Sequence, residues 1–210
     1  GGSLSGSAYV FTSNSGSWVQ ADKVVASDGV QGDLFGQTVA GLSSTSFLVG
    51  SNYDDDMGSA SGSAYVFTSY ASSWIQSSKI VASDGFAAQH FGKGLSALSS
   101  GIFVVGAPDE LSETGSGSAY VFSQDSSSWV LSGKVQSTDM QATQGLGRRV
   151  AGLSYNRFIA GAQTDDTSTG AVYVFTLTST ESPTLVPTLV PTLKPTFKPT
   201  TAPTESPTLV

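Results

Sequence analysis

The stretch that decides the fold is Gly6-Ser7-Ala8-Tyr9-Val10-Phe11, because it recurs along the chain. It returns unchanged at 62–67 and 117–122, and as Gly-Ala-Val-Tyr-Val-Phe at 170–175. In a strand, Ala8 and Val10 point to one side and Tyr9 and Phe11 to the other. Both faces are apolar, so we expect each copy to be a strand buried between two layers.

Other segments repeat with the same period. The tyrosines stand at 9, 65, 120 and 173, and the tryptophans at 18, 74 and 129. Between successive copies of the first strand, three more short apolar segments are separated by Ser-Asp-Gly or Gly/Ser turns, and helical periodicity appears nowhere. Four short antiparallel strands per unit are typical of a propeller blade. We therefore predict an all-β fold of β-propeller-type blades over residues 1–178.

The residues of the third unit carry a family resemblance. Phe91-Gly92, the segment Val-Val-Gly-Ala-Pro at 104–108 and the Gly-Ser-Ala-Tyr-Val-Phe that follows resemble the FG-GAP repeat. This is the blade unit of integrin α-chain propellers and of many bacterial and algal surface proteins. The resemblance covers about residues 6–175, with Leu146 in place of phenylalanine and no Gly-Ala-Pro at 50–52 or 161–163. It implies an extracellular propeller with an adhesive or ligand-binding role.

The number of blades is unusual for a propeller. The chain opens with the last half of a repeat, contains two full repeats and ends with three strands of another, which makes just over three blades. Family propellers typically close with seven blades, and rings usually need at least four. Unpaired edges invite pairing with another chain. We interpret the chain as part of a larger propeller or of one completed by other subunits; an open stacked array is the alternative.

Residues 179–210 form a second region with a different composition. Proline stands at every fourth position from Pro183 to Pro207, and threonine follows each one. Such a sequence favours an extended polyproline II path and resembles O-glycosylated stalks. We expect a glycosylated spacer or a filament-packing segment in an extracellular or cell-surface protein. The candidate attachment sites are Thr184, Thr188, Thr192, Thr196, Thr200, Thr204 and Thr208.

Composition excludes several classes of function. A net charge of −7 argues against nucleic-acid binding, and there is no apolar run long enough to span a bilayer. Cysteine is absent, which does not decide the compartment. His90 is the single histidine, and Leu34 and Gly145 occupy its position in other repeats. Because no nucleophile elbow accompanies it, we predict no catalytic site and no enzyme activity.

Calcium is the cofactor that the resemblance raises. Many family members bind it through an Asp-x-Asp-x-Asp-Gly loop, whose alternate oxygens wrap one cation. The corresponding connections here, 41–46, 97–100 and 152–156, contain no acidic residue, so we expect no cofactor. Acidic residues lie instead in the next loop, where we expect solvated turns with weak metal candidates. These candidates are Asp54, Asp56, Asp109 and Asp165.

Three tryptophans are the candidates for stacking on a ligand. Trp18, Trp74 and Trp129 could stack on sugars if exposed, or each could pack on its own blade. Lys23, Lys79 and Lys134 also recur, and we expect them to extend along a blade edge. We predict a non-enzymatic extracellular structural or adhesive protein that associates with itself, other extracellular proteins or glycans. The alternative is a monomeric module that binds a glycan or a protein.

Overall fold

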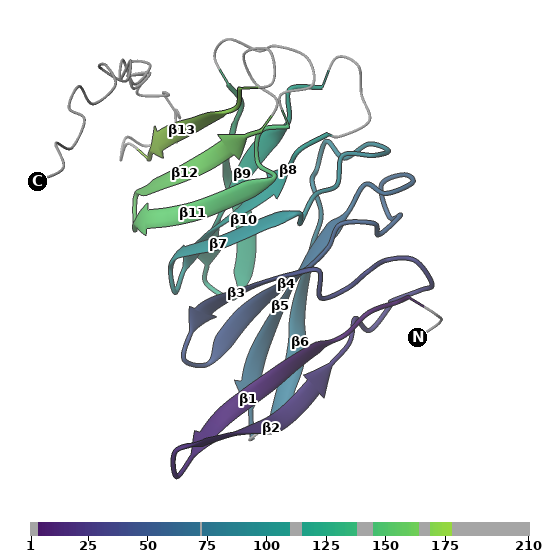
Figure 1. Ribbon diagram of the computed structural model, residues 1–210, viewed down its shortest axis with the longest axis vertical. Coiled ribbons are helices and arrows are strands. Elements are labelled where there is room, and N and C mark those ends of the chain that lie inside the picture. The colour runs from purple at the N-terminus through teal and green to yellow at the C-terminus, as the bar shows by residue number, and fades with distance from the viewer. Residues whose placement is uncertain (1–3, 72, 110–114, 138–144, 164–168, 178–210) are drawn as a thin grey trace, which may run out of the picture.

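The computed structural model describes residues 4–71, 73–109, 115–137, 145–163 and 169–177, and these residues form an all-β fold (Figure 1). The segment 179–210, with all seven candidate threonines, lies outside the described residues, as does Asp165. No helix occurs in the described part of the chain, and so none that could span a membrane. The prediction of antiparallel, propeller-type blades is confirmed.

Thirteen strands form four sheets in the described residues, and each sheet is one blade. Blade 1 has two strands, blades 2 and 3 have four each, and blade 4 has three, as the repeats predict. Strand order follows the chain in every blade, with antiparallel neighbours.

Blade 1 consists of β1 (Ala8–Asn14) and β2 (Ser17–Val24). Blade 2 consists of β3 (Thr38–Ser43), β4 (Ser46–Ser51), β5 (Ser63–Tyr70) and β6 (Ser73–Ile80). Blade 3 consists of β7 (Gly94–Ser99), β8 (Ile102–Ala107), β9 (Ser118–Asp125) and β10 (Ser128–Val135). Blade 4 consists of β11 (Arg149–Ser154), β12 (Arg157–Ala162) and β13 (Ala171–Thr176).

The blades stack face to face in chain order, and the hydrophobic cores lie between them. One cluster joins Val24 of blade 1 to Tyr65 and Phe67 of blade 2, and two more join blade 2 to blade 3 and blade 3 to blade 4. The inner strand β7 also lies against β3 of blade 2 and β11 of blade 4. Figure 1 shows β1 and β2 at one end of the stack and β11–β13 at the other.

This arrangement explains why the recurring strand is apolar on both sides. In β9, Tyr120 and Phe122 pack toward blade 2, whereas Ala119 and Val121 pack toward blade 4. The tyrosine and phenylalanine therefore face upstream, and the small residues face downstream. Burial on both faces is confirmed for β5 and β9, whose first five residues are all buried.

For β1 the expectation of burial on both faces is wrong. Tyr9 is 49% exposed and Phe11 is 54% exposed, whereas Tyr65 and Phe67 are 0% and 2% exposed. The physical reason is that no blade in the described structure lies upstream of blade 1. At the other end, the downstream-facing Val172 of β13 is exposed for the corresponding reason.

Successive blades are joined through one repeated element, which we name the interblade turn: Phe35–Gly36, Phe91–Gly92 and Leu146–Gly147. In the second turn, the Phe91 amide donates to the Ser61 carbonyl of blade 2, with N and O 2.9 Å apart. The Gly92 amide donates to the Gly106 carbonyl of blade 3 at 3.1 Å. The other two turns make the same pair of bonds, at 3.0 Å from Phe35 and Gly36 and at 3.0 and 3.1 Å from Leu146 and Gly147. Leu146 is fully buried, so it fills the place of the phenylalanine.

The interblade turn requires a glycine directly before the strand that it meets. Gly62 has a φ of +85°, and a Cβ added there would overlap the backbone of Phe91. A residue with a side chain would therefore meet both a disfavoured backbone conformation and a backbone clash.

Replacing this glycine tests the turn. We expect Gly62→Ala to lower the free energy of unfolding by about 2–3 kcal/mol, from strain in the left-handed region together with the clash. The matched control is Gly41→Ala, because nothing lies within 4 Å of a Cβ added at Gly41. Chemical denaturation measures both, and equal stability of the two variants would contradict this role of the turn.

Candidate interaction surface

Between blades 1 and 2, one lysine gathers three aspartates. The Lys79 ammonium from β6 lies 2.6 Å from Asp28, 3.0 Å from Asp54 and 2.6 Å from Asp56, measured from Nζ to a carboxylate oxygen. Asp28 belongs to the turn after β2, and the other two aspartates to the loop between β4 and β5. The Tyr65 hydroxyl is also within hydrogen-bond distance of Asp28 and Asp54, at 3.0 Å from each. We call these five residues the Lys79 cluster.

The protonation states of the Lys79 cluster reinforce one another. Partial burial opposes ionisation of Asp28, but hydrogen bonds from Lys79 and Tyr65 outweigh it and hold its pKa below the ordinary value. Burial, followed by the charge of Asp54, raises the pKa of Tyr65. Burial also disfavours the charged form of Lys79, yet the hydrogen bonds to its three carboxylates raise its pKa. The ammonium therefore stays charged and the phenol stays protonated at neutral pH.

A smaller version of the arrangement joins blades 2 and 3. Lys134 lies 2.6 Å from Asp84, and the Tyr120 hydroxyl donates to the same carboxylate at 2.9 Å. The Gln89 amide donates to the Tyr120 oxygen at 2.7 Å. Burial opposes ionisation of Asp84, but hydrogen bonds from Lys134 and Tyr120 lower its pKa. We call these four residues the Lys134 cluster.

These contacts correct two expectations about the loops and lysines. Asp54 is 4% exposed and Asp109 is 8% exposed, so neither lies in a solvated turn. Lys79 and Lys134 do not simply extend along a blade edge, because each binds the aspartate of the turn that follows the preceding blade. These ion pairs could not be predicted from the sequence, because each lysine and its aspartate come from neighbouring repeats.

Of the metal candidates within the described residues, two lie in the Lys79 cluster and Asp109 lies in neither cluster. Asp54 and Asp56 do converge, together with Asp28, which the sequence had not singled out; their ligand oxygens lie within 4.8 Å of one another. Asp55 points elsewhere and accepts from the Ala60 amide at 2.7 Å. Because Lys79 bonds all three converging carboxylates, the cluster supplies its own cation, and a divalent ion would have to displace that ammonium. Asp109 lies in the following blade, apart from these three.

The interblade faces are lined with aromatic rings that repeat from blade to blade. In blade 2, Phe67 stacks on Phe47 with ring centroids 5.4 Å apart, and Trp74 packs on Phe47 at 4.8 Å. Phe35 of the interblade turn meets Phe67 edge to face at 5.8 Å. Blade 3 repeats these contacts with Phe103, Phe122, Trp129 and Phe91.

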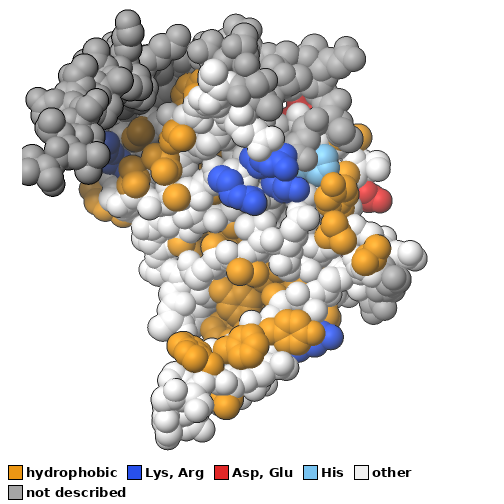
Figure 2. Space-filling view, in the orientation of Figure 1, with side chains coloured by type: hydrophobic (Ala, Val, Ile, Leu, Met, Phe, Trp, Pro, Cys, Tyr) orange, Lys and Arg blue, Asp and Glu red, His pale blue; other side chains and the backbone are white. Residues whose placement is uncertain are grey.

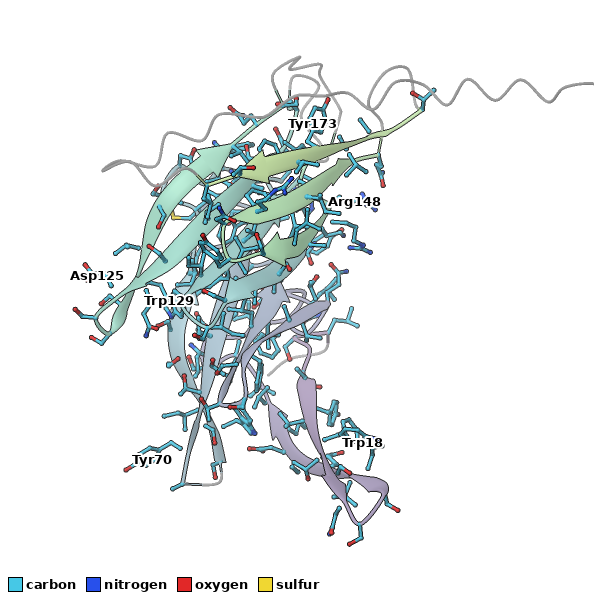
Figure 3. The ribbon with its side chains drawn as sticks, turned by 90° about the vertical axis from the view of Figure 1, so that its left-hand side faces the viewer. Trp18, Tyr70, Asp125, Trp129, Arg148 and Tyr173 are labelled. Atoms are coloured by element: carbon cyan, nitrogen blue, oxygen red, sulfur yellow. The ribbon has the colours of Figure 1, made fainter. Side chains whose placement is uncertain are left out.

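The same face is open on blade 1. Trp18 is 74% exposed, beside the exposed Tyr9 and Phe11, and we call these three residues the open aromatic face. Figure 2 shows hydrophobic side chains gathered at this end of the molecule, and Figure 3 shows Trp18 on the β1–β2 end. Trp74 and Trp129 are only partly exposed because they pack on Phe47 and Phe103. Of the three candidates for ligand stacking, Trp18 therefore offers the largest free surface.

His90 lies inside the protein and not on an exposed surface. It is 2% exposed and meets the Tyr53 ring edge to face, with ring centroids 5.0 Å apart. Its backbone amide donates to the Ala60 carbonyl at 3.1 Å. This position suits a packing residue of the loop before the second interblade turn.

Comparison with protein families agrees with the repeats seen in the structure. Residues 18–67 and 74–122 each match the FG-GAP repeat model. The chain contains FG-GAP repeats. Each matched repeat begins on the tryptophan strand of one blade and ends on the central strand of the next, so it includes one interblade turn. A search of curated proteins found no match to the chain.

The two lysine clusters allow a matched mutational test. The side chains of Lys79 and Asp54 are 18% and 5% exposed, whereas those of Lys134 and Asp84 are 31% and 50% exposed. We expect Lys79→Met to lower the free energy of unfolding by about 2–3 kcal/mol, between the ranges for exposed and buried ion pairs. We expect Lys134→Met to cost less than about 1 kcal/mol.

Denaturant titration at neutral pH measures both variants. Equal losses would contradict the expectation that the burial of Asp54 makes the Lys79 cluster the more stabilising of the two.

Proposed function

We propose that this FG-GAP repeat chain is a non-enzymatic extracellular structural or adhesive protein that associates with itself. In this proposal, the blades provide the contact surface, and residues 179–210 act as a glycosylated spacer or filament-packing segment. FG-GAP repeats point to an adhesive or interaction module, which supports the general class of the proposal.

The observation that carries the proposal is the open aromatic face. Its counterparts Tyr65 and Phe67 are at most 2% exposed, because a preceding blade covers them. On blade 1 the same ring positions are about half exposed, and the free edge of β1 has no strand beside it in the described structure. An apolar face next to an open strand edge is a surface that other β-structure binds.

Two further features support a structural role in preference to a catalytic one. FG-GAP repeat proteins are generally non-enzymatic. The single histidine is buried against Tyr53 and is therefore poorly placed to act on a substrate. The extracellular location and the glycosylated spacer rest on the composition of 179–210, where threonine follows each regularly spaced proline.

A second candidate function is favoured by one residue. Trp18 is 74% exposed, and an exposed indole can stack on a sugar or fill a pocket of a protein partner. A monomeric glycan- or protein-binding module would use this surface without self-association.

Self-association is tested by light scattering as the protein concentration is raised. We expect a concentration-dependent rise in mass for the wild type, and at least a tenfold weaker association for the double variant Phe11→Ser/Trp18→Ser. The expected weakening follows from burying two large apolar side chains at about 1.5–3 kcal/mol each. The matched control is Tyr70→Ser, because Tyr70 is 71% exposed, like Trp18, but lies at the far end of β5.

A wild type that remains monomeric at every concentration would contradict the proposed self-association. Loss of glycan binding in the Phe11→Ser/Trp18→Ser variant of such a monomer would then assign the open aromatic face to the second function.

A further inference from the structure

We propose that a pocket between blades 2 and 3 binds one neutral sugar unit. The pocket has a volume of about 320 Å³. Sites for small molecules typically measure about 300–1,000 Å³. We call it the Gln89 pocket, and the proposal goes beyond self-association because it uses neither the open aromatic face nor a second copy of the chain. The lining side chains that carry the argument are Phe86, Gln89, Asp109, Ser116, Lys134 and Gln136.

The walls of the Gln89 pocket come from two blades. Phe86 and Gln89 belong to the loop that follows blade 2, and the other lining residues belong to blade 3 or its loops. The Asp109 amide donates to the Gln89 carbonyl oxygen, with N and O 3.1 Å apart. This backbone bond holds the two sides of the pocket together, so the site does not depend on long flexible side chains alone.

The strongest indication of a ligand is the side-chain oxygen of Gln89. The Gln89 side chain is 1% exposed, and its amide nitrogen donates to the Tyr120 oxygen. The single hydroxyl hydrogen of Tyr120 goes to Asp84, so Tyr120 cannot also donate to Gln89. Gln89 Oε1 therefore has no donor among the described residues. Buried acceptors in native proteins are nearly always paired with protein, water or ligand, which points to a donating group from a bound molecule.

The charges around the Gln89 pocket favour a neutral ligand. Lys134 is already paired with Asp84 at 2.6 Å, and Asp109 adds a second carboxylate to the surroundings. The ammonium disfavours a metal cation, and the two carboxylates disfavour an anion. The walls offer acceptors at Gln89 and Asp109 and donors at Ser116 and Gln136. Neighbouring hydroxyl groups, each of which donates and accepts, match this mixture.

Phe86 supplies the apolar part of the site. Its side chain is 42% exposed although it lines the pocket, so one part of the ring is open to a ligand. A sugar ring presents C–H groups that pack on an aromatic ring and hydroxyls that bond to polar walls. A neutral polar molecule without such a face would leave Phe86 unused.

The preceding repeat shows which residues distinguish this pocket. Val30 stands two residues after Asp28, where Phe86 stands two residues after Asp84. Val81 likewise follows Lys79 by two residues, where Gln136 follows Lys134. Between blades 2 and 3, an aromatic ring and an amide thus replace two valines at positions that line the pocket. Both changes add groups that bind sugars.

A second difference concerns the tyrosine. Between blades 1 and 2, the Asp54 carboxylate of the chain itself bonds both Tyr65 and Lys79. Between blades 2 and 3, Tyr120 bonds Asp84 and the neutral Gln89 amide. The two sites therefore share the lysine and tyrosine but differ in the groups that a ligand would meet.

Ligand-observed NMR on the full chain tests the proposal. The probes are glucose, galactose, mannose, fucose and N-acetylglucosamine, each alone and as its methyl glycoside. We expect at least one of them to bind, and the double variant Phe86→Val/Gln136→Val to bind it about tenfold more weakly, from loss of one ring contact and one hydrogen bond. Both changes restore the residues of the preceding repeat, so the fold should be retained.

Gln89→Met tests the buried acceptor itself. We expect about three- to tenfold weaker binding, because a ligand hydroxyl loses its acceptor. Thermal unfolding of each variant confirms that it is folded. The control is Trp18→Ser, which alters the open aromatic face and should leave sugar binding unchanged. Light scattering on Phe86→Val/Gln136→Val should show the same self-association as the wild type.

The outcomes separate this site from the other proposed functions. Failure of every probe to bind would overturn the proposal and leave self-association untouched. Sugar binding that is lost in Trp18→Ser but unchanged in Phe86→Val/Gln136→Val would also overturn it and assign the sugar to the open aromatic face. Binding weakened by the pocket variants alone supports it: equal binding of the methyl glycoside indicates the end of a glycan chain, and binding of the free sugar alone indicates a free monosaccharide.

Discussion

The structure depends on the interblade turn, where two consecutive backbone amides bond to two different blades. Phe91 donates to blade 2 and Gly92 donates to blade 3, and the same division occurs at the other two turns. A backbone bond of this kind fixes the spacing between sheets more tightly than side-chain packing alone. Because the turn at Phe91 approaches Gly62, and the turn at Gly147 approaches Gly106, too closely for a Cβ, these turns also dictate where glycine stands in each repeat.

Once the spacing between blades is fixed, aromatic packing and charge follow from it. The upstream-facing rings of one blade pack against the previous blade. The lysine clusters form ion pairs between the same two blades. In the Lys79 cluster, Asp28 of the turn after blade 1 pairs with Lys79 of β6 in blade 2. This ion pair therefore acts between the two blades. Each blade therefore covers a face of its neighbour, as expected for a repeat architecture, and among the described residues one face of blade 1 and one of blade 4 are exposed.

Much of this fold follows from the sequence. The recurrence of Tyr9, Tyr65, Tyr120 and Tyr173 predicts the blades, their strand number and the incomplete blades at both ends, and alternation within the strand predicts its two buried faces. The ion clusters were not predicted, because their members lie far apart in sequence and come together only where two blades pack against each other. A signal was nevertheless present: the turn aspartates and the lysines recur with the same period as the tyrosines that they contact. The exposure of Trp18 likewise required knowing which blade would cover it.

Native-state hydrogen exchange at the interblade turns tests the central claim most directly. If the turns hold the blades together, the amides of Phe91 and Gly92 should exchange as slowly as the central amides of β5 and β9, because all would open only when the blades separate. Exchange of these two amides at the rate of exposed loops, with β5 and β9 still protected, would contradict the account and leave packing alone to join the blades.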